Sequence, residues 1–301
     1  MSEAIAVVGS VAFDTIETPT GRAEEVLGGS ATHFAVAASY FAPVRLVAVV
    51  GEDFPRDARD YLASRGIDLS GLEVGSGRSF RWTGRYHEDL NVRDTLKLEL
   101  NVFADFKPRL AEAVRRTPYV FLANIDPTLQ EGVLDQFIGP TLVACDTMNH
   151  WIEGARAALE QLLPRVDLLV VNDEEARLLS GERNVARAAR RILDRGPKRV
   201  LIKRGEYGAI LFSAASVFAV PAYPLEEVFD PTGAGDSFAG GLMGYLAATG
   251  DHSERGLRRA IVYGSVLASY VVEDFGGRRL ATVSRDDVER RYRQFVSLTE
   301  F

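Results

Sequence analysis

Cysteine is almost missing from this chain, because Cys145 is the only one among 301 residues. A single thiol cannot form an intramolecular disulfide, and it cannot build a zinc site from several thiolates. The sequence therefore excludes a disulfide framework and a thiolate metal cluster. A hydrophobic core must stabilise the fold instead, and a hydrophobic content of 47% is sufficient for one.

Basic runs and long apolar runs are also missing. The 35 Lys and Arg residues are outnumbered by 42 Asp and Glu residues, which gives a net charge of -7. An acidic protein without a basic patch is a poor partner for nucleic acids and anionic membranes. No segment approaches a membrane span of roughly 20 apolar residues, and the N-terminal stretch lacks a basic leader. We expect a soluble cytoplasmic protein that acts on small molecules.

Short β-branched apolar runs alternate with amphipathic segments along most of the chain. We predict buried strands at residues 5–9, 45–51, 119–123, 141–146, 167–172 and 199–205. Between them lie helical patterns, at residues 31–40, 153–163 and 185–194. Three further helical patterns follow residue 234. Alternation of this kind predicts an α/β fold with a mostly parallel sheet and helices on both faces.

Polar residues end three of these predicted strands, namely Asn124, Asp146 and Asn172. In open α/β sheets, ligands bind beyond the carboxyl ends of the strands. We therefore expect the three side chains to face one binding site, although Asn and Asp also favour turns in the absence of any ligand.

Residues 79–102 break this rhythm, because their hydrophobic pattern has a period of two. Two rows of side chains result, with Phe80, Trp82 and Tyr86 on one parity and Arg81, Arg85 and His87 on the other. The pattern predicts a small antiparallel flap outside the main sheet. The flap could be a lid whose aromatic side chains cover a nucleobase or a sugar, or a clasp between two subunits. Neither parity can be assigned to the site side, and Arg85 is our candidate for a lid contact.

A tight turn stands directly against a predicted helix start in "FDPTGAGDSFAGGLMGYL", residues 229–246. Gly233 and Gly235 permit backbone angles closed to other residues and let a ligand approach the backbone. The first N–H groups of a helix have no partner inside it and lie at the positive end of its dipole, so they form an anion site. In the absence of a ligand, Asp236 or Ser237 could cap this helix.

The Gly-Ala-Gly turn beside a carboxylate is better suited to phosphoryl transfer than to simple capping. Backbone amides can stabilise charge on a migrating phosphoryl group, while a carboxylate takes the proton of the attacking hydroxyl. A cap alone needs one polar residue and no pair of glycines.

"DPTGAGD" resembles the C-terminal signature of the ribokinase-like, or PfkB-type, carbohydrate kinases. Four further segments agree with that family in order and spacing, namely "GSVAFD", "LGGSATHFAVAASYF", "VNDEEA" and "IKRGEYGAIL". The resemblance extends from about residue 5 to residue 295. It implies a single ribokinase-like domain over residues 1–301, a three-layer sandwich with a β lid inserted at roughly residues 72–103.

Within that resemblance, Asp236 corresponds to the general base that activates the acceptor hydroxyl. Gly233, Ala234 and Gly235 correspond to the anion hole for the migrating phosphoryl group. These four residues are the catalytic residues that the resemblance implies.

The acceptor contacts that the resemblance implies are Asp14 and the Gly28-Gly29 pair, and Asn124 is our strand-end candidate beside them. His33 stands where ribokinase-type sequences usually have Asn, which puts recognition of a simple ribose-like ring in doubt. The imidazole can donate one hydrogen bond and accept another, as Asn can. Metal ligation by His33 is disfavoured, because no second His or Cys lies at ligand spacing.

On the nucleotide side, Asn172 and Glu175 resemble the pair that organises Mg²⁺, through water, and the phosphates of ATP. The nucleotide contacts implied or suggested by the resemblance are Asn172, Lys203, Gly205, Gly208, Thr232, Gly233, Gly235 and Ser265. Many relatives bind a monovalent cation beside the signature turn. Asp230 and Thr232 are placed for K⁺ there, with residues 273–277 as the other wall.

We expect an enzyme that transfers the γ-phosphoryl group of ATP to a hydroxymethyl group of a sugar. A nucleoside kinase that uses the same site is the alternative, and a ligand-binding protein without turnover is a third hypothesis. Asp236 argues against the third, because binding alone requires no base at that position.

Overall fold

The computed structural model describes residues 2–300, which divide into two compact units. The first unit holds the N-terminal segment as far as Pro108 and the C-terminal segment from Tyr223 onward, and the second unit is Arg109–Ala222. Within residues 2–300, no helix combines the length and the apolar character that crossing a bilayer requires.

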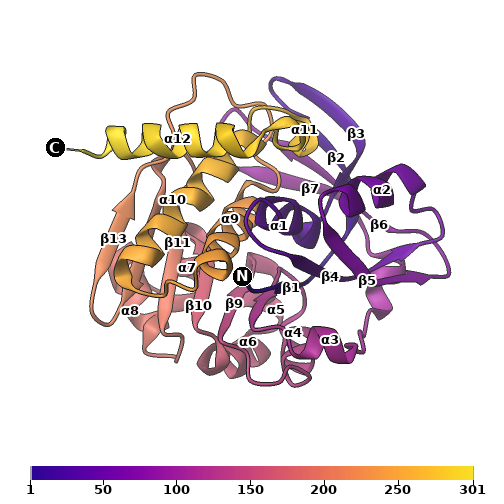
Figure 1. Cartoon of the computed structure of the whole chain (residues 1–301), viewed down its shortest axis with the longest axis horizontal. Coiled ribbons are helices and arrows are strands. Elements are labelled where there is room, and N and C mark those ends of the chain that lie inside the picture. The colour runs from indigo at the N-terminus through magenta and orange to yellow at the C-terminus, as the bar shows by residue number, and fades with distance from the viewer. Residues whose placement is uncertain (1, 301) are drawn as a thin grey trace. The chain divides into compact units, whose positions relative to one another are not determined.

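Three parallel strands form the main sheet of the first unit, in the order β1-β4-β5. β1 (Ile5–Val8) and β4 (Val44–Gly51) are buried along almost their whole length, as strands covered on both faces should be, and β5 (Ile67–Gly75) follows them. The helices of this unit are α1 (Ser30–Ala38), α2 (Arg56–Ser64), η1 (Asn101–Asp105), α9 (Ala234–Thr249), α10 (Glu254–Val271), η4 (Phe275–Gly277), α11 (Arg278–Thr282) and α12 (Arg285–Leu298) (Figure 1).

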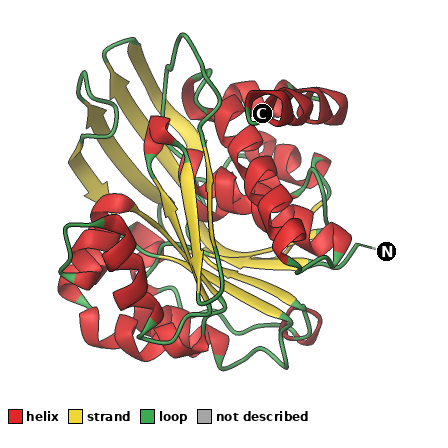
Figure 2. Cartoon of the chain, turned by 90° about the vertical axis from the view of Figure 1, so that its left-hand side faces the viewer, coloured by secondary structure: helices red, strands yellow, loops and turns green. Residues whose placement is uncertain are grey.

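Helix α9 packs closely against both α1 and α10, and its interior glycines explain how. A Cβ on Gly240 would lie 2.3 Å from the backbone oxygen of Phe34 in α1, and one on Gly241 would lie 3.0 Å from that of Tyr263 in α10. Glycine costs an isolated helix about 1 kcal/mol relative to alanine, but here the missing side chains let the helices approach each other. The start of α9 is thereby fixed to the core of the unit, and α12 packs on α10 near the C-terminus (Figure 1, Figure 2).

A second, four-stranded sheet belongs to the same unit, in the order β3-β2-β6-β7. The predicted flap forms its outer half, β6 (Phe80–Tyr86) paired antiparallel with β7 (Arg93–Glu99). The other half, β2 (Ala12–Thr18) and β3 (Gly21–Gly28), was not foreseen. The Thr-Pro-Thr-Gly turn between two short runs was the available signal for that hairpin. The predicted insertion at residues 72–103 includes the end of β5, but β5 pairs with β4 in the main sheet.

The second unit carries its own sheet, in the order β13-β12-β11-β10-β9-β8. Its four predicted strands are present and parallel: β8 (Tyr119–Leu122), β9 (Leu142–Asp146), β10 (Leu168–Asn172) and β11 (Arg199–Lys203). β12 (Ala209–Ser213) and β13 (Val217–Val220) add an antiparallel edge. Parallel pairing therefore dominates the main strands of both units, as the sequence predicts.

The helices of the second unit are short. They are α3 (Glu112–Arg115), α4 (Pro127–Leu134), α5 (Asn149–Gly154), α6 (Arg156–Leu162), η2 (Leu163–Arg165), α7 (Asp173–Ser180), α8 (Val185–Leu193) and η3 (Gly205–Tyr207). The prediction of a single helix over residues 153–163 is wrong. Two helices, α5 and α6, meet at Ala155, whose φ of -131° is not helical.

Candidate functional site

The signature turn meets α9 as the sequence predicts. Gly233 is the N-cap residue, with φ 76° and ψ 0° in the left-handed region that favours glycine. Ala234 N–H donates to the backbone oxygen of Pro231 at 3.2 Å, and Ser237 N–H donates to that of Gly233 at 2.9 Å. The N-cap residue is a glycine and has no side chain with which to cap the helix. The hydroxyl of Ser237, one of the two candidates for a cap, donates to the backbone oxygen of His33 at 3.4 Å. Gly233, Ala234, Gly235 and Asp236 are all partly exposed, so a ligand can reach the turn.

Asp230 fixes the signature turn through hydrogen bonds to two backbone N–H groups. Its side chain is fully buried and accepts two backbone hydrogen bonds, from Thr232 N–H at 2.8 Å and from Gly276 N–H at 2.9 Å. Burial raises the pKa of this carboxyl group, against the effect of both N–H donors. The signature turn and the η4 loop are therefore tied through one carboxylate. Ser265 lies in the same unit and is buried within α10.

His33 lies directly on the signature turn. A Cβ on Gly233 would lie only 2.3 Å from Cγ of the His33 ring, so the imidazole packs directly against the glycine. The ring is 7% exposed, and burial lowers the pKa of His33 to about 4. The imidazole is therefore neutral at physiological pH, and its orientation is set by packing.

Asp14 and the glycine pair come together at the junction of β3 and α1. A Cβ on Gly28 would lie 2.0 Å from Oδ2 of Asp14, so only glycine leaves room for the carboxylate. Burial raises the pKa of Asp14 to about 7, although the Gly29 N–H that donates to the carboxylate lowers it. The charge of Asp230 raises the pKa further and that of Arg93 lowers it.

Strand register decides which row of the flap shares a face with Asp14. Asp14 of β2 stands opposite Trp82 of β6, and Tyr86 of β6 stands opposite Arg93 of β7. The aromatic row therefore lies on the Asp14 face of the small sheet. Arg85 has the opposite parity and forms an ion pair with Glu17 at 2.8 Å on the other face.

Tyr86 and Arg93 are the residues that sequence reasoning missed as site candidates. The hydroxyl of Thr232 donates to the hydroxyl of Tyr86 at 3.1 Å, and both side chains are buried. Burial raises the pKa of Tyr86, whereas the charge of Arg93 lowers it. The flap thus touches the signature turn directly. The period-two row that contains Tyr86 was a usable signal, but nothing in the sequence marked Arg93.

In the second unit, Asn172 and Glu175 form a capping box at the start of α7. The side chain of Asn172 accepts from the Glu175 N–H at 2.7 Å, and the Glu175 carboxylate accepts from the Asn172 N–H at 2.7 Å. The box fixes both side chains and leaves lone pairs on their oxygens, so this donor set fits Mg²⁺ bound through water. Among residues 2–300, no group of three or more His, Cys, Asp or Glu side chains is arranged for a metal ion.

The other candidates of the second unit lie at strand ends. Nζ of Lys203 lies 3.2 Å from Oδ2 of Asp146, which brings the ends of β11 and β9 together. Oδ1 of Asn124 is buried without a hydrogen-bond partner in the described chain. Gly205 and Gly208 both have positive φ, and a Cβ on Gly208 would lie 2.0 Å from the backbone oxygen of Val220. These glycines are therefore required by the β11–β12 turn itself.

The pKa of Asp14 predicts a pH-dependent stability. Its folded value of about 7 exceeds the ordinary 3.8, so the folded state binds the proton more tightly. The stabilisation from this proton is present at low pH and is lost as the pH rises towards and through 7. We expect the free energy of unfolding of the wild type to fall more between pH 5 and pH 8 than that of Asp14→Asn. Urea denaturation at both pH values measures this, and equal slopes for the two proteins would refute it.

Comparisons with known proteins agree with this geometry. A sequence profile described as pfkB family carbohydrate kinase matches residues 134–282. A cytidine kinase from Thermococcus kodakarensis is 32% identical over 247 residues, which cover 80% of this chain and 88% of that protein.

Solved structures share the fold. A nucleoside kinase from Methanocaldococcus jannaschii gives a TM-score of 0.78 at 22% identity, with 97% of this chain and 98% of that chain covered. Ribokinase from Cryptococcus neoformans var. grubii in complex with ADP gives 0.79 at 21% identity, with 96% and 100% covered. The predicted fold class, an α/β structure with a mostly parallel sheet and a smaller second sheet, is confirmed.

Proposed function

Since this chain belongs to the pfkB family of carbohydrate kinases, we propose that it transfers the γ-phosphoryl group of ATP to the hydroxymethyl group of a nucleoside. The observation that carries the choice of acceptor is the pairing of Asp14 with Trp82. One face of the small sheet then offers a carboxylate for sugar hydroxyls beside an indole for a base. The cytidine kinase of T. kodakarensis and the nucleoside kinase of M. jannaschii support this class of acceptor.

In this proposal the acceptor sugar lies against the backbone of Gly28 and Gly29, and its hydroxyls donate to Asp14. His33 borders the acceptor, because its ring lies on Gly233 of the signature turn. The burial of Asp14 strengthens a hydrogen bond to it, since water competes little there. Tyr86 joins the flap to the turn, which supports a lid that excludes water from the phosphoryl group.

The second unit would contribute the ATP contacts, through Asn172, Lys203, Gly205 and Gly208. Asn172 and Glu175 would hold Mg²⁺ through water, and the ion would neutralise charge on the phosphates. The ADP complex of the C. neoformans ribokinase supports an adenine nucleotide. K⁺ would lie beside Asp230 and Thr232, where it would share the Asp230 oxygens with the N–H groups of Thr232 and Gly276.

Asp236 would act as the general base. It accepts the proton of the acceptor hydroxyl as the hydroxyl oxygen bonds to the γ-phosphorus, and the bond from that phosphorus to the β–γ bridging oxygen breaks. The amides of the 233–235 turn stabilise the negative charge of the transferred group. Partial exposure of the turn supports access for both substrates.

A panel of acceptors tests the proposal. We expect kcat/KM for one or more nucleosides to exceed that for free ribose by at least tenfold, and Trp82→Leu to reduce only the nucleoside value. Base–aromatic stacking is worth roughly 1–3 kcal/mol, so the loss should be about 10- to 100-fold. Trp151→Leu is the matched control, because Trp151 is the other tryptophan of the chain and lies in the second unit. It should change kcat/KM neither for the nucleoside nor for ribose. A wild-type preference for ribose or another free sugar would instead favour the sugar kinase.

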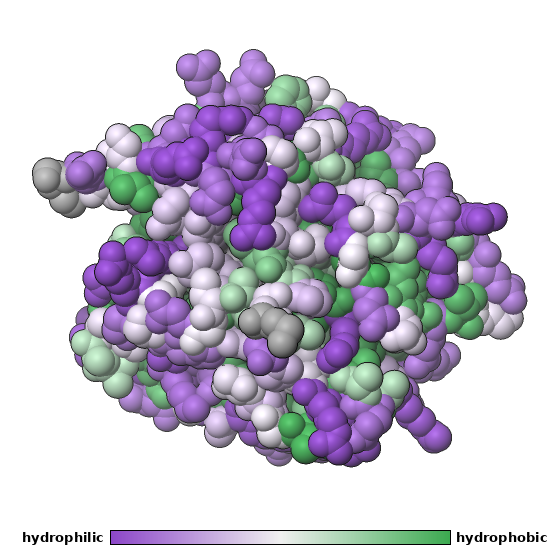
Figure 3. Space-filling model, in the orientation of Figure 1, coloured by the Kyte–Doolittle hydropathy of each residue, from purple (hydrophilic) through white to green (hydrophobic). Residues whose placement is uncertain are grey.

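A homodimer through the small sheet remains a further proposal. β7 is the outermost strand of that sheet, and the exposed apolar side chains on or beside it are Val92, Leu96, Leu98 and Leu100. In Figure 3, apolar side chains gather on the side of the surface where Figure 1 places β5 and β6. An exposed apolar edge strand favours pairing with another copy, and the molar mass in solution decides it. A cytoplasmic location stays a prediction from the sequence.

A further inference from the structure

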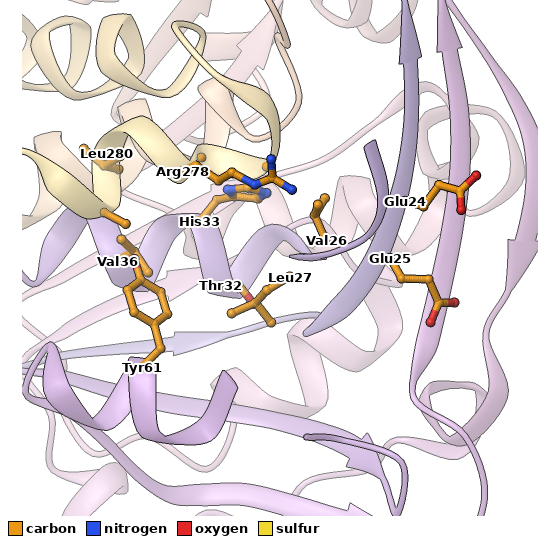
Figure 4. A pocket seen from close by; sticks show the side chains of 13 residues that line it. Glu24, Glu25, Val26, Leu27, Thr32, His33, Val36, Tyr61, Arg278 and Leu280 are labelled. Carbon is orange, nitrogen blue, oxygen red and sulfur yellow. The ribbon is translucent and has the colours of Figure 1, made fainter. Parts of the chain in front are cut away.

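A cavity of about 390 Å³ lies beside α1 in the first unit, and we call it the α1 cavity (Figure 4). Its apolar walls come from β3, α1 and α11, and include Val26, Leu27, Val36, Leu280 and Ala281. Neither the Asp14 carboxylate nor Asp236 lines it. A cavity of this size with apolar walls and a few polar groups is typical of small-molecule sites.

Two buried polar atoms, on consecutive residues that line the cavity, have no hydrogen-bond partner within residues 2–300. They are Oγ1 of Thr32 and Nε2 of His33, on residues that are 3% and 7% exposed, and residues 2–300 offer neither a partner. Both residues line the α1 cavity. Buried polar atoms are nearly always paired, so two unpaired atoms indicate a ligand with polar groups of its own. The neutral imidazole can donate or accept at Nε2, according to its tautomer.

The charges around the cavity favour an anion. In Figure 4 the Arg278 side chain lies beside His33, whereas the carboxylates of Glu24 and Glu25 point away. Both carboxylates already form ion pairs with arginines of the small sheet. Arg278 is exposed and forms no ion pair within residues 2–300. A guanidinium at the mouth of a cavity is suited to bind phosphate through two parallel hydrogen bonds.

We propose that the α1 cavity is a second ligand site, which binds a nucleoside monophosphate as an effector rather than as an acceptor. The base lies between the apolar walls, its heteroatoms pair with Thr32 and His33, and its phosphate pairs with Arg278. The site shares His33 with the border of the acceptor site, but Gly233, Ala234, Gly235 and Asp236 do not line it. The inference does not depend on which acceptor is phosphorylated.

We expect occupancy of the α1 cavity to affect the signature turn. One wall is β3, a strand of the small sheet, and another is Gly276 and Gly277 of the η4 loop, which Asp230 ties to the turn. His33 reaches the turn a second time, because its ring lies on Gly233. A ligand that contacts these segments together changes the affinity for the acceptor, and by linkage the acceptor changes the affinity for the ligand.

Calorimetric titration of the full chain with cytidine and adenosine 5′-monophosphate, in the absence of ATP, tests the proposal. We expect at least one of them to bind, and the corresponding nucleoside or inorganic phosphate alone to bind at least tenfold more weakly at this site. Thr32→Val and Arg278→Gln should each weaken the monophosphate at least tenfold, while kcat/KM without effector stays within twofold of the wild type. Arg279→Gln is the matched control, since Arg279 pairs with Glu273 and does not line the cavity.

Three results would overturn the proposal. The first is the absence of any binding. The second is binding that survives both variants and is lost in Asp14→Asn, which would place the monophosphate in the acceptor site as a product. The third is a bound monophosphate that leaves the acceptor affinity unchanged. The acceptor panel is measured without monophosphate, so failure of the proposed function and failure of this inference are distinguishable.

Discussion

Asp236→Asn is expected to lower kcat by about 10²- to 10⁴-fold, the usual contribution of a positioned general base, while ATP still binds. Asn keeps the size and the polarity of the side chain but cannot accept the proton of the acceptor hydroxyl at neutral pH. Because the residue lies in the first turn of α9 and is partly exposed, the change should disturb the fold little. Steady-state kinetics and titration of the variant with an ATP analogue measure the two quantities.

Asp286→Asn is a matched control for that substitution. Asp286 also lies in the first turn of a helix, α12, and it is exposed. Any loss of stability or activity that both variants share would reflect removal of a negative charge from a helix start. Such a charge stabilises a helix by a few tenths of a kcal/mol to about 1 kcal/mol. A kcat for Asp236→Asn within tenfold of the wild type would show that the base is another group.

Gly233→Ala is expected to displace the turn, and thereby to misalign its amide donors and destabilise the fold. We expect kcat to fall by about 10²- to 10³-fold, the usual cost of losing one donor from an oxyanion hole. The residue has φ 76°, which costs a residue with a side chain about 1–2 kcal/mol. The new Cβ would also lie 2.3 Å from the His33 ring, so the turn or the ring must move. Kinetics, together with thermal unfolding, separate the two effects.

Gly250→Ala measures the cost of the left-handed backbone conformation alone, without a steric clash. Gly250 ends the same helix in the same left-handed region, with φ 63°, but a Cβ there would meet nothing within 4 Å. We expect Gly250→Ala to lower the melting temperature by a few degrees and to leave kcat unchanged. Adding His33→Ala to Gly233→Ala should recover part of the lost stability. Equal effects of the two glycine substitutions would mean that contact with His33 is unimportant.

Local patterns predicted the parts of this fold that local forces determine. The buried strands of the second unit and the turn before α9 were readable because their hydrophobicity and glycine content depend on neighbours in the chain. The small sheet was only half readable. Its β2–β3 hairpin is partly exposed, and its place beside β6 depends on pairing across more than sixty residues.

The site was less readable than the fold for the same reason. Trp82 and Tyr86 share a face with Asp14 because β6 pairs with β2, and no pattern within β6 contains that information. A register shift between β6 and β7, at Thr83/Gly84, adds to the difficulty of placing Arg93. The roles that we assign to Asp236, Asn172 and Glu175 stay predictions, which the substitutions above address.

The division of the chain has a consequence for biosynthesis. The first unit combines a segment that ends at Pro108 with one that starts at Tyr223, so Asp14 leaves the ribosome well before the loop around Asp230 does. Until the later segment arrives, the nascent protein lacks α9, the helix against which α1 packs. A premature stop codon after residue 222 would leave a polypeptide without Asp236, which could transfer no phosphate by the route proposed above.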